Sequence, residues 1–447
     1  MLRRYLGQIA IRSTDAYLSL RMTSLSPASS STSRIPEIRV PGALTLTGLI
    51  CGLVLGLLLA GKPQAQPALA IAAPVGSLWL QGLQMTILPL VAGLLFSGIV
   101  ETVAAAKAGL MARRTLGIIV GFLAFSAILG AVAMPLLLDL FPAPAGVSFA
   151  QGVTPGKVPG LSDFLASLLP YNVVSAAAAS AMLPVIVFVG LFAFASTRLR
   201  DEPRKLLALL FEGLAGAMMV VIGWVLKLAP IGVFALGLSL GVRSGGAALG
   251  ALAHYIVLVV TVGTVVMIAG YAIAVIAGRR SLSAFFKAML PAQVVAVSTQ
   301  SSLATLPTML AASRRLGVAT TTAEFALPLA VTLFRATGPA MNMGVAIYAA
   351  KLAGVELSAG ALAAGAFVAF ATTFGAVSLP GTISFVSSIG PIAATMGVPL
   401  GPLGVLVAVE VVPDLMRTLG NVTMDVAVST AVDAGMKTEE APEETLH

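Results

Sequence analysis

The chain has 447 residues, of which 58% are hydrophobic and 10% are charged, and its mean hydropathy is +1.01. A soluble protein has about 25% charged residues, so this composition indicates a polytopic membrane protein. The net charge of +8 is not the footprint of a nucleic-acid-binding protein, because most lysines and arginines stand in short segments between apolar runs. One cysteine and two histidines exclude a disulfide framework and His-rich metal chemistry.

Residues 1–42 are rich in serine and carry several arginines. A segment of this composition cannot bury a core, so we expect a disordered cytoplasmic tail. No compact apolar stretch with a cleavage site follows the first arginines, which argues against a signal peptide. Met22 is an alternative to Met1 as the start of translation.

Six apolar runs then predict membrane-spanning segments. The fourth is too long for one crossing of about 20 residues, and its small residues at 175–181 indicate a broken or multi-segment helix. The predicted runs are 43–61, 76–103, 115–141, 161–197, 205–240 and 248–278.

Beyond residue 280 the apolar pattern is interrupted twice, at 281–313 and at 358–400. Serine, glycine and proline break each segment into halves too short to span, which predicts two re-entrant helical hairpins. One span, 324–350, lies between them, and a last helix follows. Paired segments broken by glycine and proline are the sequence pointer to the binding site of an inverted-repeat transporter.

The distribution of positive charge agrees with eight crossings and two hairpins that enter from opposite sides. With the N-terminus inside, the predicted inner loops carry eleven lysines and arginines and the outer loops four, as the positive-inside rule requires. The inner residues are Lys107, Arg113, Arg114, Arg198, Arg200, Arg204, Lys205, Arg279, Arg280, Arg314 and Arg315; the outer ones are Lys62, Lys157, Arg243 and Lys351.

The most informative stretch is the last apolar segment, 401–434. At the helical period of 3.6 residues, six of its polar side chains fall within a stripe of roughly 100°. Ionised groups in a membrane helix normally face a bundle interior or a water-filled cavity and mark a ligand path. A structural Asp414–Arg417 pair is the alternative, but it leaves the other members unexplained. The stripe consists of Glu410, Asp414, Arg417, Thr418, Asn421 and Asp425.

The motif at 414–425 matches D-x-x-R-T-x-x-N-x-x-x-D in the last helix of the dicarboxylate/amino acid:cation symporters, the glutamate transporter family. The segments 300–307 and 375–381 are similar to that family's two hairpin tips, and the resemblance covers about 40–430. It implies an inverted-repeat elevator transporter and a homotrimer. Scaffold spans would cover 43–103 and 161–240, and transport spans 115–141 and 248–430, before an acidic cytoplasmic tail at 431–447.

The resemblance also implies roles for individual residues. Asp414 would hold a substrate ammonium group and Arg417 a substrate carboxylate, with Thr418 and Asn421 beside them. A planar guanidinium binds a carboxylate through two hydrogen bonds, and hydroxyls at a half-helix N-terminus favour an anion. The remaining substrate-binding residues expected from the hairpins and the seventh span are Ser301, Ser302, Gly338, Ser378, Pro380 and Gly381.

The chain departs from the family at 334–338. The family's N-M-D-G-T, whose Asn and Asp help bind sodium, is replaced here by Phe-Arg-Ala-Thr-Gly. A sodium ion would have only Asn421 and Asp425 left as ligands on the last helix, so both sodium and proton stay open as the coupling ion. We hypothesise that Arg335 is a built-in cation that replaces at least one sodium ion, with Asp425 as its first expected partner and Glu410 or Asp414 next. Coupling would then be to protons, through Asp425 or Glu410, or absent. A purely structural role of Arg335 is the alternative.

These observations predict a secondary active symporter of acidic amino acids or related dicarboxylates, without a cofactor, in a bacterial-type inner membrane with both termini cytoplasmic. Its partners are the small acidic substrate and membrane lipid. An uncoupled or channel-like carrier, and a carrier of another small amino acid or organic anion, are the alternatives. An intramembrane hydrolase using Ser301 or Ser302 is disfavoured, because His254 has no carboxylate near it in sequence to form a base.

Overall fold

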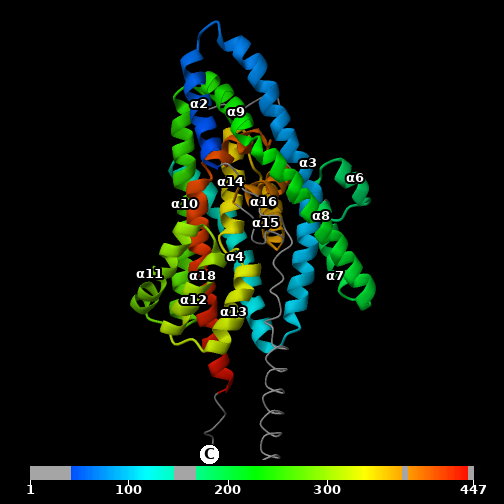
Figure 1. Cartoon of the computed structure of the whole chain (residues 1–447), viewed down its shortest axis with the longest axis vertical. Helices are drawn as coiled ribbons and strands as arrows, with labels where there is room; N and C mark the ends of the chain where they lie inside the picture. The colour runs from blue at the N-terminus through cyan, green and yellow to red at the C-terminus, as the bar shows by residue number, and fades with distance from the viewer. Residues whose placement is uncertain (1–41, 145–167, 375–380, 441–447) are drawn as a thin grey trace, which may run out of the picture. The chain divides into compact units, whose positions relative to one another are not determined.

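The computed structural model describes residues 42–144, 168–374 and 381–440, and regular structure in these ranges is entirely helical (Figure 1). The predicted all-α class is confirmed. The helices are α2 (Gly42–Leu59), α3 (Ala65–Ala106), α4 (Leu110–Leu140), α6 (Val173–Ala178), α7 (Met182–Ser196), α8 (Asp201–Lys227), α9 (Ala229–Ser244), α10 (Ala247–Ile276), α11 (Leu282–Thr299), α12 (Ser302–Arg315), α13 (Thr320–Leu333), α14 (Gly338–Leu352), α15 (Ala359–Thr373), α16 (Gly381–Thr395), α17 (Gly401–Leu406), the 3₁₀ turn η1 (Val407–Val409) and α18 (Val411–Glu440).

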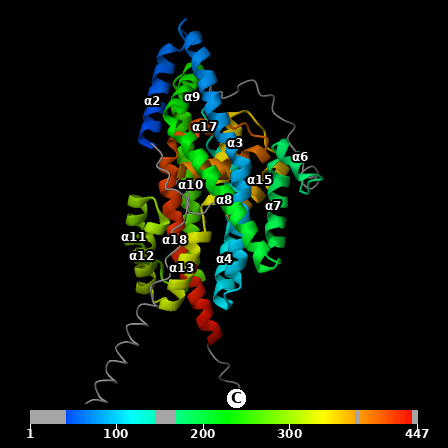
Figure 2. The ribbon, with the colours of Figure 1, turned by 45° about the vertical axis from the view of Figure 1, so that its right-hand side comes forward.

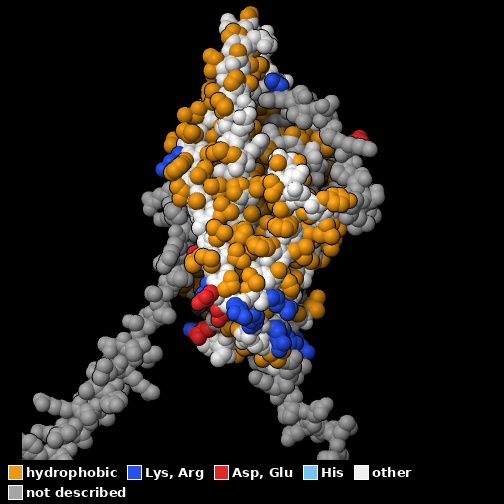
Figure 3. All heavy atoms as spheres, turned by 90° about the vertical axis from the view of Figure 1, so that its right-hand side faces the viewer, with side chains coloured by type: hydrophobic (Ala, Val, Ile, Leu, Met, Phe, Trp, Pro, Cys, Tyr) orange, Lys and Arg blue, Asp and Glu red, His pale blue; other side chains and the backbone are white. Residues whose placement is uncertain are grey.

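Five helices of the described chain are long and apolar enough to cross a membrane, namely α3, α4, α8, α10 and α11. Shorter apolar helices, among them α7 and α15, accompany them. Hydrophobic side chains cover the broad middle of the face in Figure 3, whereas lysine, arginine and acidic side chains gather toward one end. A contiguous apolar belt of this size needs lipid around it. The chain is therefore a polytopic membrane protein.

Glycines let α2 and α9 approach more closely than other side chains would allow. A β-carbon added at Gly241 of α9 would lie 2.5 Å from the Leu53 carbonyl oxygen and 3.1 Å from the Gly56 Cα. Gly48 and Gly52 of α2 meet the α9 backbone in the same way. Small residues at four-residue spacing are the usual means of packing helices tightly in a membrane, where apolar burial supplies little driving force.

We expect Gly241→Ala to destabilise the protein, because the new methyl group meets backbone that cannot move without separating α2 from α9. Overpacking of this kind costs about 1–3 kcal/mol. Thermal unfolding of the purified protein in detergent measures the effect. Gly117→Ala in α4 is the matched control, since a β-carbon there has no neighbour within 4 Å. Equal melting temperatures for both variants would contradict the close packing.

The two helices of each predicted hairpin are present and pack on each other. Helices α11 and α12 turn at Gln300, whose φ of 51° is left-handed, and they lie against α13 and α18 in both ribbon views (Figure 2). Helices α15 and α16 also pack side by side. The tip of this second hairpin, residues 375–380, lies outside the described residues.

The structure corrects one predicted span and refines two others. Residues 324–350 are not one helix, because α13 ends at Leu333 and α14 begins at Gly338. The run 205–240 divides at Leu228, two residues before Pro230, which cannot donate a backbone hydrogen bond. In the described part of 161–197, the expected broken helix appears as α6 and α7.

The last stretch, 401–434, is also divided. The short helix α17 and the turn η1 precede α18, so Glu410 lies just before the long helix and not within it. The Asp414 amide nonetheless donates to the Glu410 carbonyl oxygen at 2.8 Å. The helical spacing predicted for the polar stripe therefore holds from Glu410 onward. In both ribbon views α18 runs alongside α10.

Candidate functional site

The break between α13 and α14 is held by side chains of two other helices. The Ser126 hydroxyl on α4 donates to the Ala336 carbonyl oxygen at 2.6 Å. The Thr337 amide and hydroxyl both lie 2.9 Å from Asn421 Oδ1 on α18, which accepts from them. Irregular backbone at membrane depth is tolerated only where such partners satisfy its polar groups. The break is therefore stabilised by specific hydrogen bonds, and it faces α18.

Arg417 lies at the centre of the predicted polar stripe. Its Nη2 donates to Glu410 Oε1 at 2.5 Å, and its Nη1 donates to Asn342 Oδ1 on α14 at 2.6 Å. Its Nε lies 3.5 Å from Asp414 Oδ1. All three nitrogens of the guanidinium are thus directed at oxygen atoms, although the residue is only 7% exposed.

Glu410 has a second partner that ties the cluster to α10. The Tyr255 hydroxyl, which is fully buried, donates to Glu410 Oε2 at 3.0 Å. Charge-assisted hydrogen bonds in a low-dielectric interior are stronger than neutral ones. Residues from α10, α14 and α18 therefore converge on one buried network of a guanidinium, two carboxylates, an amide and a phenol.

Three other members of the predicted set lie on α18. The Thr418 hydroxyl donates to the Asp414 carbonyl oxygen at 3.0 Å, back along its own helix. Asn421 and Asp425 are each 1% exposed. Asn421 accepts a hydrogen bond from Thr337. Both carboxylate oxygens of Asp425, in contrast, are buried without a hydrogen-bond partner among the described residues.

Arg335 lies in the break itself, between Leu333 and Gly338. Its Nε is buried without a hydrogen-bond partner, and it forms no ion pair with any residue that the structure describes. The predicted direct pair with Asp425 is therefore not present. The charges of Asp414 and Asp425 nevertheless act on Arg335.

The hydrogen bonds of Ser301 stay within the first hairpin. The Ser301 hydroxyl caps α12 by accepting from the Ala304 amide at 3.2 Å, and Ser302 is the first residue of that helix. Gly338 and Gly381 are the first residues of α14 and α16. Ser378 and Pro380 lie outside the described residues.

Sequence reasoning missed Tyr255, Thr337 and Asn342. Asn342 left one signal, since it is the single amide in the apolar sequence of α14. Tyr255 and Thr337 left none, because a tyrosine or threonine in an apolar run is common. Their roles depend on which helices pack together.

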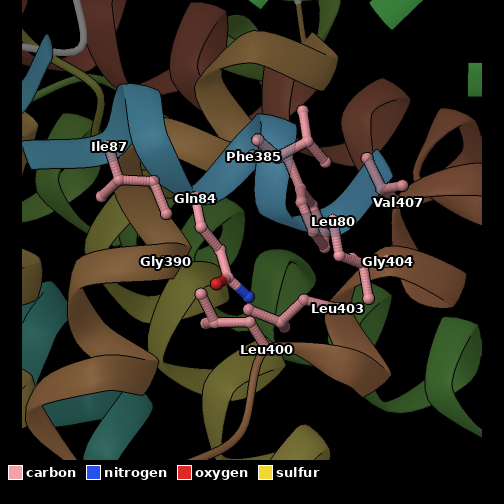
Figure 4. Close-up of a pocket in the computed structure, with 10 residues that line it drawn as sticks. Leu80, Gln84, Ile87, Phe385, Gly390, Leu400, Leu403, Gly404 and Val407 are labelled. Atoms are coloured by element: carbon pink, nitrogen blue, oxygen red, sulfur yellow. The ribbon is translucent and has the colours of Figure 1, made fainter. Parts of the chain in front are cut away.

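A small apolar cavity lies between α3 and the segment from α16 to η1 (Figure 4). Its volume of about 30 Å³ is room for little more than a water molecule. Among its lining side chains only Gln84 is polar, so this cavity is unsuited to a charged solute. The lining residues are Leu80, Leu83, Gln84, Ile87, Phe385, Gly390, Leu400, Leu403, Gly404 and Val407.

A polytopic helical bundle with broken helices, two hairpins and a buried charged network has the architecture of a membrane transporter. The family model described as the sodium:dicarboxylate symporter family matches residues 42–434, and the chain belongs to this family. Its members are transporters, so the chain is a transporter and not an enzyme.

Several relatives whose names state a function are similar over most of their length. The proton/sodium-glutamate symport protein of Bacillus subtilis is 28% identical over 84% of this chain and 88% of that protein. The proton/glutamate-aspartate symporter of Escherichia coli is 26% identical over the same shares. A C4-dicarboxylate transport protein of Rhodopseudomonas palustris is 27% identical over 76% of this chain and 77% of that protein.

Proposed function

We propose that this chain is a secondary active symporter that moves acidic amino acids or related dicarboxylates and couples them to protons. The observation that carries the proposal is Arg417, a buried guanidinium with Glu410 and Asp414 within reach. Relatives named as proton/glutamate-aspartate and C4-dicarboxylate carriers support the substrate class.

The network suggests how a proton and a substrate are linked. Glu410 Oε1 accepts a hydrogen bond from Arg417 Nη2 at 2.5 Å. A substrate carboxylate would bind to that same nitrogen. A proton on Glu410 removes the negative charge that holds the guanidinium, so the donor becomes available to substrate. Each substrate carboxylate therefore enters together with a proton. Asp414 remains beside the guanidinium to receive an ammonium group.

The proposal includes the arrangement of the moving parts. Helices α2, α3, α8 and α9 pack mainly on one another and supply the scaffold, while α18 packs on α10 and both helices of the first hairpin. The second group carries the charged network and moves with the substrate. We place the protein as a homotrimer in a bacterial-type inner membrane, with both termini cytoplasmic. The substrate path involves Ser301, Ser302, Gly338, Ser378, Pro380, Gly381, Thr418 and Asn421.

The test is uptake of labelled glutamate, aspartate and succinate into proteoliposomes under separately imposed proton, sodium and potassium gradients. Accumulation above equilibrium under an inward proton gradient supports the proposal. If the internal solute concentration only reached the external one, whatever gradient is imposed, the protein would instead be an uncoupled or channel-like carrier. Binding without flux would identify a sensor.

We expect Asp414→Asn to impair uptake of glutamate more than uptake of succinate, because only glutamate offers a cation to the carboxylate. A lost charged hydrogen bond of about 1.5–3 kcal/mol corresponds to a rise in apparent KM for glutamate of roughly 10- to 150-fold. The measurement is the KM ratio for the two solutes in proteoliposomes.

Asp433→Asn is the matched control for this prediction. Asp433 is a buried carboxylate on the same helix that pairs with Arg280 at 3.0 Å, away from the network. Its loss should lower stability and leave the KM ratio unchanged. If Asp414→Asn raised both KM values equally, Asp414 would be a structural partner of Arg417 only.

A further inference from the structure

Asp425 is a buried carboxylate without a direct partner in the described part of the chain. It is 1% exposed, and neither oxygen has a hydrogen-bond partner among the described residues. Its neighbours Met424, Val426 and Ala427 are fully buried and apolar. A carboxylate in such surroundings is unfavourable unless a positive charge compensates it.

Arg335 supplies that charge from the break between α13 and α14. Among the residues that the structure describes, Arg335 is the positively charged side chain whose charge acts on Asp425. Its Nε is also buried and has no hydrogen-bond partner among the residues that the structure describes. In a low-dielectric interior two opposite charges attract over distances at which water would screen them. Each charge therefore offsets part of the cost of burying the other, although the two side chains form no direct ion pair.

The backbone fixes Arg335 on this side of α18. Thr337, two residues later, bonds through its amide and hydroxyl to Asn421. Asn421 and Asp425 are four residues apart and thus lie on one face of the helix. The Gly338 amide donates to the Arg335 carbonyl oxygen at 2.8 Å, which closes the turn that carries the side chain. The backbone that carries Arg335 is thereby held beside the face of α18 that bears Asp425.

We infer that Arg335 is a tethered cation that takes the place of a dissociable sodium ion at Asp425, so that this carrier runs without sodium at that site. The inference rests on the proposed function and specifies its coupling. A sodium ion beside Asp425 would be repelled by the guanidinium, whose charge is already there to compensate the carboxylate. Removal of the guanidinium opens the site to a diffusible cation.

The first test measures thermal unfolding of the detergent-purified protein in sodium chloride and in choline chloride at equal ionic strength. The wild type and Arg335→Lys should melt at the same temperature in both salts. Arg335→Met should be stabilised specifically by sodium, by several degrees. Sodium-specific stabilisation of the wild type, or none in Arg335→Met, would overturn the inference.

The second test measures glutamate uptake against sodium concentration at constant pH. Wild-type uptake should be independent of sodium, and Arg335→Met should acquire a dependence of about 5- to 150-fold, the usual range for a linked ligand. Steep sodium dependence in the wild type overturns the inference. Absence of uptake of any acidic solute would refute the proposed function, whereas the unfolding measurement needs no solute and still decides the role of Arg335.

A double variant that removes both charges keeps the inference testable if the single variant does not fold. If Arg335→Met alone does not yield folded protein, Arg335→Met combined with Asp425→Asn removes both charges together. Recovery of folded protein in the double variant, with no response to sodium, supports the compensation between the two groups. A double variant as poorly folded as the single one contradicts it.

Discussion

Arg417→Ala should nearly abolish uptake of glutamate, aspartate and C4-dicarboxylates. The guanidinium is buried, and its nitrogens are directed at Glu410, Asp414 and Asn342. It is therefore the cation best placed to receive a substrate carboxylate. Loss of one partner of a buried charge pair costs about 2–5 kcal/mol, which corresponds to roughly 30-fold to several thousandfold in affinity.

Two controls separate binding from folding. Arg417→Lys keeps the positive charge but loses the planar guanidinium, which can bind a carboxylate through two hydrogen bonds. This variant should retain weak uptake with reduced affinity for substrate. Arg280→Ala removes another arginine that pairs with a carboxylate of α18, at 3.0 Å from Asp433. It should lower the melting temperature and leave KM unchanged. An Arg417→Ala protein with normal apparent affinity would remove Arg417 from the site.

Glu410→Gln should uncouple uptake from the proton gradient. The neutral amide resembles the protonated acid and cannot hold the Arg417 guanidinium by charge. Substrate should therefore bind whether or not a proton gradient is imposed. Exchange of internal for external glutamate should persist. Accumulation driven by an inward proton gradient should fall about tenfold or more, to near equilibrium, because a proton is no longer carried with each substrate.

Tyr255→Phe is the control for this prediction. It removes the hydroxyl that donates to Glu410 Oε2 but leaves the carboxylate and its charge. Proton-driven accumulation should therefore persist in this variant, with only a modest change in rate. If accumulation in Glu410→Gln equalled that of the wild type, the coupling proton would belong to another group, and Asp425 would be the next candidate.

Much of the site was predictable because a helix imposes a period on its side chains. The spacing from Glu410 to Asp425 placed six polar groups on one face of an apolar segment, and the cost of charge in lipid indicated an interior position. The network of Arg417 with Glu410 and Asp414 agrees with that face. The hairpins were also predictable, since serine, glycine and proline leave apolar halves too short to cross.

The break at 334–337 was not predictable in the same way. Residues 324–350 are apolar, and the turn contains neither proline nor glycine before Gly338. Gly338 and Pro339 follow at once, and this dipeptide is a local signal for a turn and for the start of a new helix. The sequence does not show what satisfies the freed backbone groups, because the partners Ser126 and Asn421 come from helices far away in the chain.

The sequence by itself determined the class of protein, the two hairpins and the polar face of the last helix, because composition and periodicity act locally. Only the tertiary structure decided which groups meet. Asn342 and Tyr255 join Arg417 and Glu410 because α10 packs on α18 and α14 packs on α10. Packing likewise decided that Arg335 and Asp425 form no direct pair with each other, since two side chains meet only when the segments that carry them are assembled.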